Sequence, residues 1–317
     1  MIRYALSRVV QAVPTLIGMS ILIFLLVRLL PGDVSTSLAG AEGSGSEAQR
    51  EELLASFGLK DPLPLQYWNF VSGFFTGAMG KSFLSGYPVT QILASAVPIT
   101  LEITFLAVLF AVVVGIPLGV LSAVKRNSAW DVVIRVAGLF GLSMPSFWFA
   151  ILALLFTSTV FSWVPSVTWI PFWTDPLGNL GQMALPALAV SLALLAGIMR
   201  MTRTSMLDVL GDDYVRTARA KGANATRVVM RHALRNALVP VITLTGAEIG
   251  SLMGGTTVIE VVFGLPGVGN TLVQATYLRD YPIVQTTAMF LAVVFIVLNI
   301  LVDLLYKTLD PRIEFSS

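Results

Sequence analysis

Few of the residue types that perform covalent chemistry occur in this sequence. There is no cysteine, and the one histidine is His232, so a thiolate nucleophile and a multi-histidine metal cluster are excluded. The run Gly80-Lys81-Ser82 matches the end of a phosphate-binding loop, but the first glycine of that motif would be residue 75, which is Phe75. A His-Glu-x-x-His motif is also missing. We therefore expect that the chain has no catalytic site of its own.

The most informative polar stretch runs from Asp212 to Pro240. It is too polar to cross a membrane but helix-forming on either side of Gly222, which predicts helix, break, helix. Three arginines recur every four residues and so share one helix face, and apolar residues surround that face. These arginines are Arg227, Arg231 and Arg235. Two interpretations follow: a solvated loop whose cations meet anionic lipid head groups, or an amphipathic docking helix for a cytoplasmic protein.

A second candidate feature is a carboxylate, Glu248, within an apolar stretch. A charged group inside a bilayer is costly and marks a functional site by default. We predict that Glu248 lines a path through the membrane, and the alternative is a structural hydrogen bond to a neighbouring helix. Weaker candidates for the same path are Ser251, Ser143 and Met144.

The composition explains which elements must position these groups. Of the 317 residues, 56% are apolar and only 12% are charged, with a mean hydropathy of +0.82, whereas a soluble domain has about 25% charged residues. The net charge of +2 is too small to indicate nucleic-acid binding. The sequence predicts an all-α, polytopic membrane protein with about six transmembrane helices. The expected spans are residues 9–30, 98–123, 132–161, 181–203, 238–262 and 283–306.

Basic residues are distributed unevenly between the connecting segments. Most of them flank the ends of the spans that would share one side with residues 204–237, and the positive-inside rule makes that side cytoplasmic. Five of the 20 Lys and Arg residues remain outside: Arg28, Arg50, Lys60, Lys81 and Arg279. Both termini are then cytoplasmic. We expect the first apolar run to be an uncleaved helix, because it is long enough to span a bilayer.

The first external segment, residues 31–97, is expected to form a small cap. Ser46 and Gln49 have capping-box spacing, a short helix can follow through Phe57, and Gly58 can end it. An aromatic cluster then favours a segment lying against the membrane surface. Its members are Tyr67, Trp68, Phe70, Phe74 and Phe75.

Glycines and prolines recur inside the apolar stretches. Glycines spaced four apart permit close helix approach, either within the chain or against another subunit. They are Gly115 with Gly119, and Gly246 with Gly250 and Gly254. Prolines are expected to bend three of the spans. They are Pro117, Pro145 and Pro186.

The polar stretch resembles the cytoplasmic coupling loop of ABC-importer permeases, in which Glu-Ala-Ala, three residues and Gly form a loose signature. Ala218 and Gly222 occupy matching positions, while the two positions before Ala218 differ. The runs DYVRTARAKG and HALRNALVP are similar to the dipeptide and oligopeptide class of these permeases. The resemblance extends over nearly the whole chain, including RYALSRVVQAVPTLIGMSILIFLLVRLLPGD near the start and GGTTVIEVVFGLPGVGNTLVQATYLRDYPIVQ near the end.

This resemblance implies a type I importer fold and an assembly of five proteins in a bacterial plasma membrane. The partners would be a second, related permease, two cytoplasmic ATPase subunits that bind ATP and Mg²⁺, and an external solute-binding protein. The segment from Tyr214 to Arg231 would carry movement of the ATPases into the membrane helices. Its expected contact residues are Tyr214, Arg216, Ala218, Lys221 and Gly222, with Arg227 and Arg231 nearby.

The substrate implied by the resemblance is a dipeptide or oligopeptide. Nickel complexes, glutathione and opines are alternatives, because permeases for all of them look alike in these regions. Two rivals from other classes stay open: a secondary transporter that uses Glu248 for proton coupling, and a membrane anchor that recruits a partner without transport.

Overall fold

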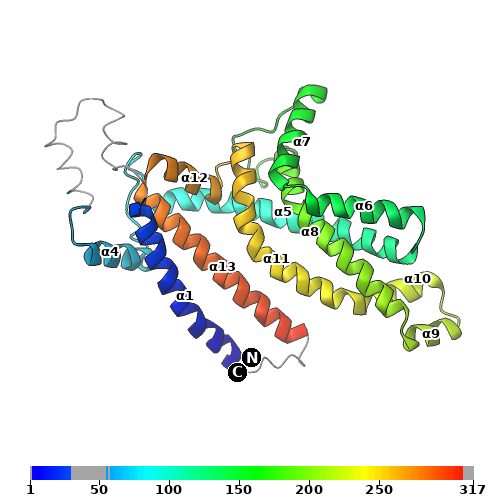
Figure 1. Ribbon diagram of the computed structural model, residues 1–317. Helices are drawn as coiled ribbons and strands as arrows, with labels where there is room; N and C mark the ends of the chain where they lie inside the picture. Colours follow the sequence, from blue (N-terminus) through cyan, green and yellow to red (C-terminus); the bar gives the residue numbers. More distant parts are fainter. Residues whose placement is uncertain (1, 30–54, 56–57, 310–317) are drawn as a thin grey trace. The chain divides into compact units, whose positions relative to one another are not determined.

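The computed structural model describes residues 2–29, 55 and 58–309 (Figure 1). All regular secondary structure in these residues is helical, apart from one isolated antiparallel bridge between Lys81 and Pro88. The chain forms two compact units, residues 1–100 with 266–300 and residues 101–265 with 301–317. Each unit is described separately. The expected capping box at Ser46 and Gln49 lies outside the described residues.

The first unit contains α1 and α4, the start of α5, α12 and most of α13. Their bounds are α1 Ile2–Leu29, α4 Leu63–Thr76, α5 Val89–Val124, α12 Val268–Leu278 and α13 Tyr281–Leu309. A buried apolar cluster joins α1, α5, α12 and α13. Its members include Val27, Val89, Leu93, Val268 and Ile283. Burial of such side chains in a small cluster fixes how these helix ends pack together.

The aromatic residues of α4 divide between α1 and the surface. Phe24 of α1 meets the ring of Tyr67 edge-on at 5.3 Å and stacks on Phe70 at 6.4 Å. Trp68 and Phe75 are two-thirds exposed. An exposed aromatic side chain beside a membrane helix suits the interface between lipid and water, and the location of this segment at the membrane surface stays a prediction.

The short turn after α4 is anchored to the start of α13. Ser82 Oγ and the backbone N–H of Phe83 both donate to the Asp280 carboxylate, and both Ser82 and Asp280 are 2% exposed. The hydroxyl in Gly80-Lys81-Ser82 therefore has a structural partner, which gives that run a role unrelated to phosphate binding.

The second unit is built around α8. Its helices are α6 Ala129–Ser143, α7 Ser146–Phe161, α8 Pro176–Leu210, α9 Asp213–Ala220, α10 Ala225–Arg227 and α11 Leu234–Phe263, together with the C-terminal part of α5. Helices α6, α7 and α11 all pack against α8 (Figure 1). A buried cluster of Ala111, Leu194, Ile198 and Val241 joins α5, α8 and α11.

Two glycines let α5 approach α8 closely. A Cβ atom at Gly119 would lie 2.6 Å from both the Met199 carbonyl oxygen and Thr202 Cβ, and one at Gly115 would lie 3.0 Å from Ile198 Cγ2. This pair therefore packs within the chain, which decides one of the two alternatives that the sequence left open. In α11, Gly246 and Gly250 are buried, while a Cβ at Gly254 would meet nothing within 4 Å.

The expected third span, residues 132–161, is divided between α6 and α7, with the break at Pro145, where a bend was predicted. Helices α6 and α7 meet at an angle of 105°. Met144 has extended backbone angles, φ −83° and ψ 121°, as a residue before proline prefers, and Pro145 has no N–H with which to continue the helix. The two other prolines expected to interrupt spans do not end their helices, because α5 continues through Pro117 and α8 through Pro186.

In the part of the chain that the structure describes, five helices are long and apolar enough to cross a membrane, and the bent pair α6–α7 makes a sixth if it is counted as one span. The five other expected spans correspond to the helices α1, α5, α8, α11 and α13. Four of these spans lie wholly inside their helix, and the first, residues 9–30, extends one residue beyond Leu29 of α1. The chain is a multi-pass membrane protein.

Candidate functional site

The segment between α8 and α11 consists of two short helices and a sharp break. Helix α9 ends at Ala220, and Gly222 adopts φ +82°, a left-handed conformation that costs residues with a Cβ about 1–2 kcal/mol. Asn224 then caps α10 by accepting a hydrogen bond of 2.8 Å from the Arg227 N–H. The predicted pattern of helix, break and helix is present, and Gly222 is at the break.

Tyr214 holds α9 against the start of α11. Its hydroxyl donates to the His232 carbonyl at 3.2 Å and accepts from Asn236 Nδ2 at 2.8 Å. Beneath it Val215 and Val228 are buried. Figure 1 shows α9 and α10 beyond the shared end of α8 and α11. These contacts make the segment a structured element fixed to two long helices.

Residues 228–233 form a π-helix that continues directly into α11. Ala233 belongs to a buried cluster with Ala123, Met206 and Ala237, so this wide turn is packed against α5 and α8. π-Helical turns are rare and often occur at functional sites. This π-helix could not be predicted from the sequence, because the spacing of its apolar residues fits an ordinary α-helix.

The cations of the segment point away from this packed underside. Arg216 is 70% exposed and pairs at 2.8 Å with Asp213, which is itself 91% exposed. Lys221, Arg227 and Arg231 are also exposed, whereas Ala218 is half-buried. A basic, exposed face over an apolar, anchored face is suited to binding another protein.

Glu248 lies near the middle of α11, in a stretch with no other charged residue between Arg235 and Glu260. Its side chain is exposed, and within the described ranges its carboxylate makes no hydrogen bond or ion pair. The alternative of a structural hydrogen bond to a neighbouring helix is therefore unsupported in this chain. Ser251, one turn further along α11, is exposed on the same face.

The two other path candidates lie at the break between α6 and α7. Ser143 ends α6 and is exposed, and Met144 is half-buried. Nothing among the described contacts joins either side chain to Glu248. These two candidates stay predictions that rest on their place at the bend.

A buried charged cluster at the start of α6 was not predicted from the sequence. Asp131 is fully buried and accepts two hydrogen bonds from Arg203, at 2.8 and 3.0 Å, one from Ser122 at 2.6 Å and one from the Asn127 N–H at 3.0 Å. Arg135 approaches the same carboxylate at 3.4 Å. This cluster joins α5, α6 and α8. The available signal was a single aspartate four residues before Arg135 at the edge of an apolar stretch.

A second missed carboxylate is Glu102, in the motif PITLEI near the start of the apolar part of α5. Its Oε2 accepts a hydrogen bond of 2.9 Å from Trp169 Nε1, and its Oε1 is buried with no hydrogen-bond partner. Trp169 also meets Trp173 edge-on at 6.0 Å. The signal for this pair was weak, because the two residues are far apart in sequence.

Comparison with known proteins defines the class. Residues 115–315 match the family described as binding-protein-dependent transport system inner membrane component, and residues 1–104 match the N-terminal region of such membrane components. The chain belongs to this family, and it is an ABC-importer permease.

Three relatives are similar over nearly their whole length. A Brucella suis protein, provisionally named a peptide transport system permease protein, is 42% identical over 98% of each chain. The dipeptide transport system permease protein DppB of Escherichia coli K12 is 40% identical over 99% of each. The glutathione transport system permease protein GsiC of Pectobacterium atrosepticum is 38% identical over 100% of each.

The fold is shared with a permease of known structure. A chain from the inward-facing MetNI methionine ABC transporter superposes with a TM-score of 0.58 at 20% identity, covering 70% of this chain and 98% of the other. At this identity the likeness concerns the fold alone.

Proposed function

We propose that this chain is one permease subunit of a heteromeric ABC importer that moves peptides into a bacterial cytoplasm. The observation that carries the substrate class is the near-complete similarity to permeases named for peptides and dipeptides. Glutathione, named for a third relative, is itself a small peptide. The proposed partners are a second permease, two ATPase subunits that bind ATP and Mg²⁺, and an external binding protein.

In this proposal the segment from Tyr214 to Arg231 receives movement from the ATPases. Its exposed cations, Arg216, Lys221, Arg227 and Arg231, form the face that a partner would contact. The Tyr214 contacts to His232 and Asn236 would pass displacement of α9 into α11, because a side chain held at two points moves with the helix it is bonded to. The proposed contact with the ATPases requires the segment to lie on the cytoplasmic side of the membrane.

Glu248 is proposed to line the translocation path. An unpaired carboxylate halfway along an apolar helix is unstable against lipid, so its exposed face must meet water or protein in the assembled importer. A carboxylate there can attract the ammonium group of a peptide as it leaves the external binding protein. The neighbouring hydroxyl of Ser251 can exchange hydrogen bonds with peptide amides.

Substitution of Glu248 tests this role. Glu248→Gln keeps the shape and removes the charge, and we expect peptide uptake to fall roughly tenfold, the effect of losing about 1.4 kcal/mol of attraction. Glu248→Asp, which keeps the negative charge at the same position, is the matched control and should change uptake less than threefold. Unchanged uptake by Glu248→Gln, with normal amounts of assembled complex, would contradict the assignment.

Uptake by the reconstituted complex tests the function itself. Proteoliposomes that contain the chain with its partner permease, ATPases and binding protein should accumulate labelled dipeptide only with ATP and Mg²⁺. Mass spectrometry of ligand retained by the binding protein then separates peptides from nickel complexes and opines. Uptake that continues without ATP would favour a secondary transporter, and partner binding without any uptake would favour an anchor.

A further inference from the structure

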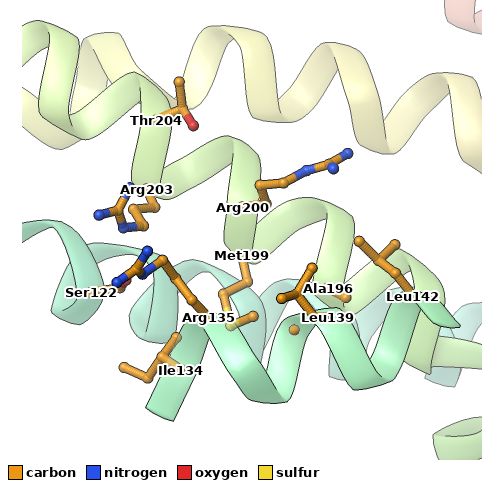
Figure 2. Close-up of a pocket in the computed structure, with 11 residues that line it drawn as sticks. Ser122, Ile134, Arg135, Leu139, Leu142, Ala196, Met199, Arg200, Arg203 and Thr204 are labelled. Carbon is orange, nitrogen blue, oxygen red and sulfur yellow. The ribbon is translucent and has the colours of Figure 1, made fainter. Parts of the chain in front are cut away.

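A hollow of about 280 Å³ lies on the surface between α6 and α8, apart from the coupling segment and Glu248. Arginines from both helices line it, together with apolar side chains from the same helices (Figure 2). The arginines are Arg135, Arg200 and Arg203, and the apolar side chains include Leu139, Leu142 and Ala196.

The cations and the apolar residues of the hollow occupy different positions along α6 and α8. Arg135 is followed by an uncharged stretch, residues 136–161, and Arg200 is preceded by another, residues 177–199. Each arginine is therefore the last charge before the part of the helix that can lie in hydrocarbon. Leu142 lies seven residues beyond Arg135, or about 10 Å further along the helix at 1.5 Å per residue. The hollow thus has a basic edge and, further along both helices, an apolar floor.

The basic edge is not neutralised by its own acidic partner. Asp131 holds Arg203 with two short hydrogen bonds and meets Arg135 at 3.4 Å, where the Arg135 side chain is still 51% exposed. Arg200 is exposed, and in the described part of the chain it makes no ion pair or hydrogen bond. The Asp131 carboxylate thus pairs with two of the three guanidinium groups, which leaves two net positive charges and unused N–H donors along this edge.

We propose that this hollow binds an anionic phospholipid of the cytoplasmic leaflet. The phosphate is held by the guanidinium group of Arg135, whose planar donor set suits phosphate oxygens, and one acyl chain lies along Leu139 and Leu142. Arg200, whose side chain points away from Arg135 in Figure 2, adds a second positive charge at the basic edge. Basic pockets between membrane helices on the cytoplasmic side have this charge complementarity to anionic head groups. The site is independent of the substrate that the importer carries.

A neighbouring hollow shows what distinguishes this one. It has a volume of about 290 Å³, lies between α5, α6 and α8, and is lined by apolar residues such as Leu118, Trp130 and Val133. It offers lipid chains a surface but offers a head group no cation. Of these two hollows, the one at Arg135 and Arg200 can discriminate between lipids by charge.

Native mass spectrometry of the purified chain, titrated with phosphatidylglycerol or phosphatidylcholine, tests the proposal. We expect tighter binding of phosphatidylglycerol by the unmodified chain. Arg200→Gln alone should weaken it roughly fivefold, and Arg135→Gln with Arg200→Gln roughly 30-fold, the factors that losing one and two cations near an anionic surface predicts. The single variant removes a side chain without a described partner, so it leaves folding intact.

The matched control is Lys125→Gln with Arg126→Gln, two exposed cations in the turn between α5 and α6 that do not line the hollow. This variant should bind phosphatidylglycerol within twofold of the unmodified chain, and millimolar inorganic phosphate should not displace the lipid. An equal loss in the control would overturn the proposal, as would displacement by phosphate. Loss of the bound lipid when the second permease joins would instead make this face a subunit interface and also overturn it.

Discussion

The carboxylate of Asp131 accepts four hydrogen bonds from three residues. It is fully buried and binds Arg203 through both oxygens, with Ser122 and the Asn127 N–H as further donors. Removing one partner of such a pair leaves the other charge uncompensated, at a cost of about 3–5 kcal/mol. We therefore expect Asp131→Asn to lower the midpoint of thermal unfolding in detergent by roughly 5 °C or more.

The exposed ion pair between Asp213 and Arg216 provides the control. It has the same 2.8 Å separation, but its side chains are 91% and 70% exposed, and exposed pairs contribute about 0–1 kcal/mol. Asp213→Asn should shift the midpoint by about 2 °C or less. Equal shifts for the two variants would show that burial of Asp131 does not determine its contribution.

The close packing at Gly119 supports a second prediction about a single residue. Gly119→Ala would place a methyl group 2.6 Å from the Met199 carbonyl oxygen and from Thr202 Cβ, so α5 and α8 must separate. Overpacking of this kind costs about 1–3 kcal/mol, and thermal unfolding should begin at a lower temperature. Gly18→Ala in α1, where a Cβ meets nothing within 4 Å, should unfold at the original temperature or above. A stable Gly119→Ala variant would show that the two helices have room to part.

Closely packed glycines and charged residues differ in how far their contacts could be predicted from the sequence. The spacing of Gly115 and Gly119 predicted close helix packing, but the partner helix, α8, could be identified only from the structure. Asp131 carried no comparable signal, because Arg203 is 72 residues away and such pairings are made by the fold. Glu248 was predictable as an expensive charge in an apolar stretch, while its exposure could come only from knowing which residues surround it.

Among the elements, the apolar helices were predictable and their ends were less so. Runs of apolar residues indicated α1, α5, α8, α11 and α13, because a bilayer imposes length and hydrophobicity together. The size of the angle between α6 and α7 could not be predicted from the sequence. A proline predicts a bend, but whether the helix continues, as at Pro186, or breaks by 105°, as at Pro145, depends on what packs around it.

The break at Gly222 supports a prediction about coupling. Gly222→Val must adopt φ +82° with a β-branched side chain, or the break must change shape, although a Cβ there meets nothing within 4 Å. We expect the importer to assemble but to lose most peptide-stimulated ATP hydrolysis, because α9 and α10 no longer present one surface. Thr226→Val places the same side chain at an ordinary helical position nearby and should retain full stimulation. Normal stimulation in Gly222→Val would remove the break from the coupling mechanism.

For the whole molecule, the distribution of basic residues predicts one orientation in the membrane. The proposed coupling segment requires residues 204–237 to be cytoplasmic, and the same orientation places the connection after α7 and helix α12 outside. Because the chain has no cysteine, single substitutions can report this without background. We expect Thr226→Cys to react with a membrane-impermeant maleimide only after cells are opened. Trp173→Cys and Tyr277→Cys, at positions 76% and 80% exposed, should react in intact cells and serve as controls for accessibility. Labelling of Thr226→Cys in intact cells would place the segment outside, where no ATPase could reach it.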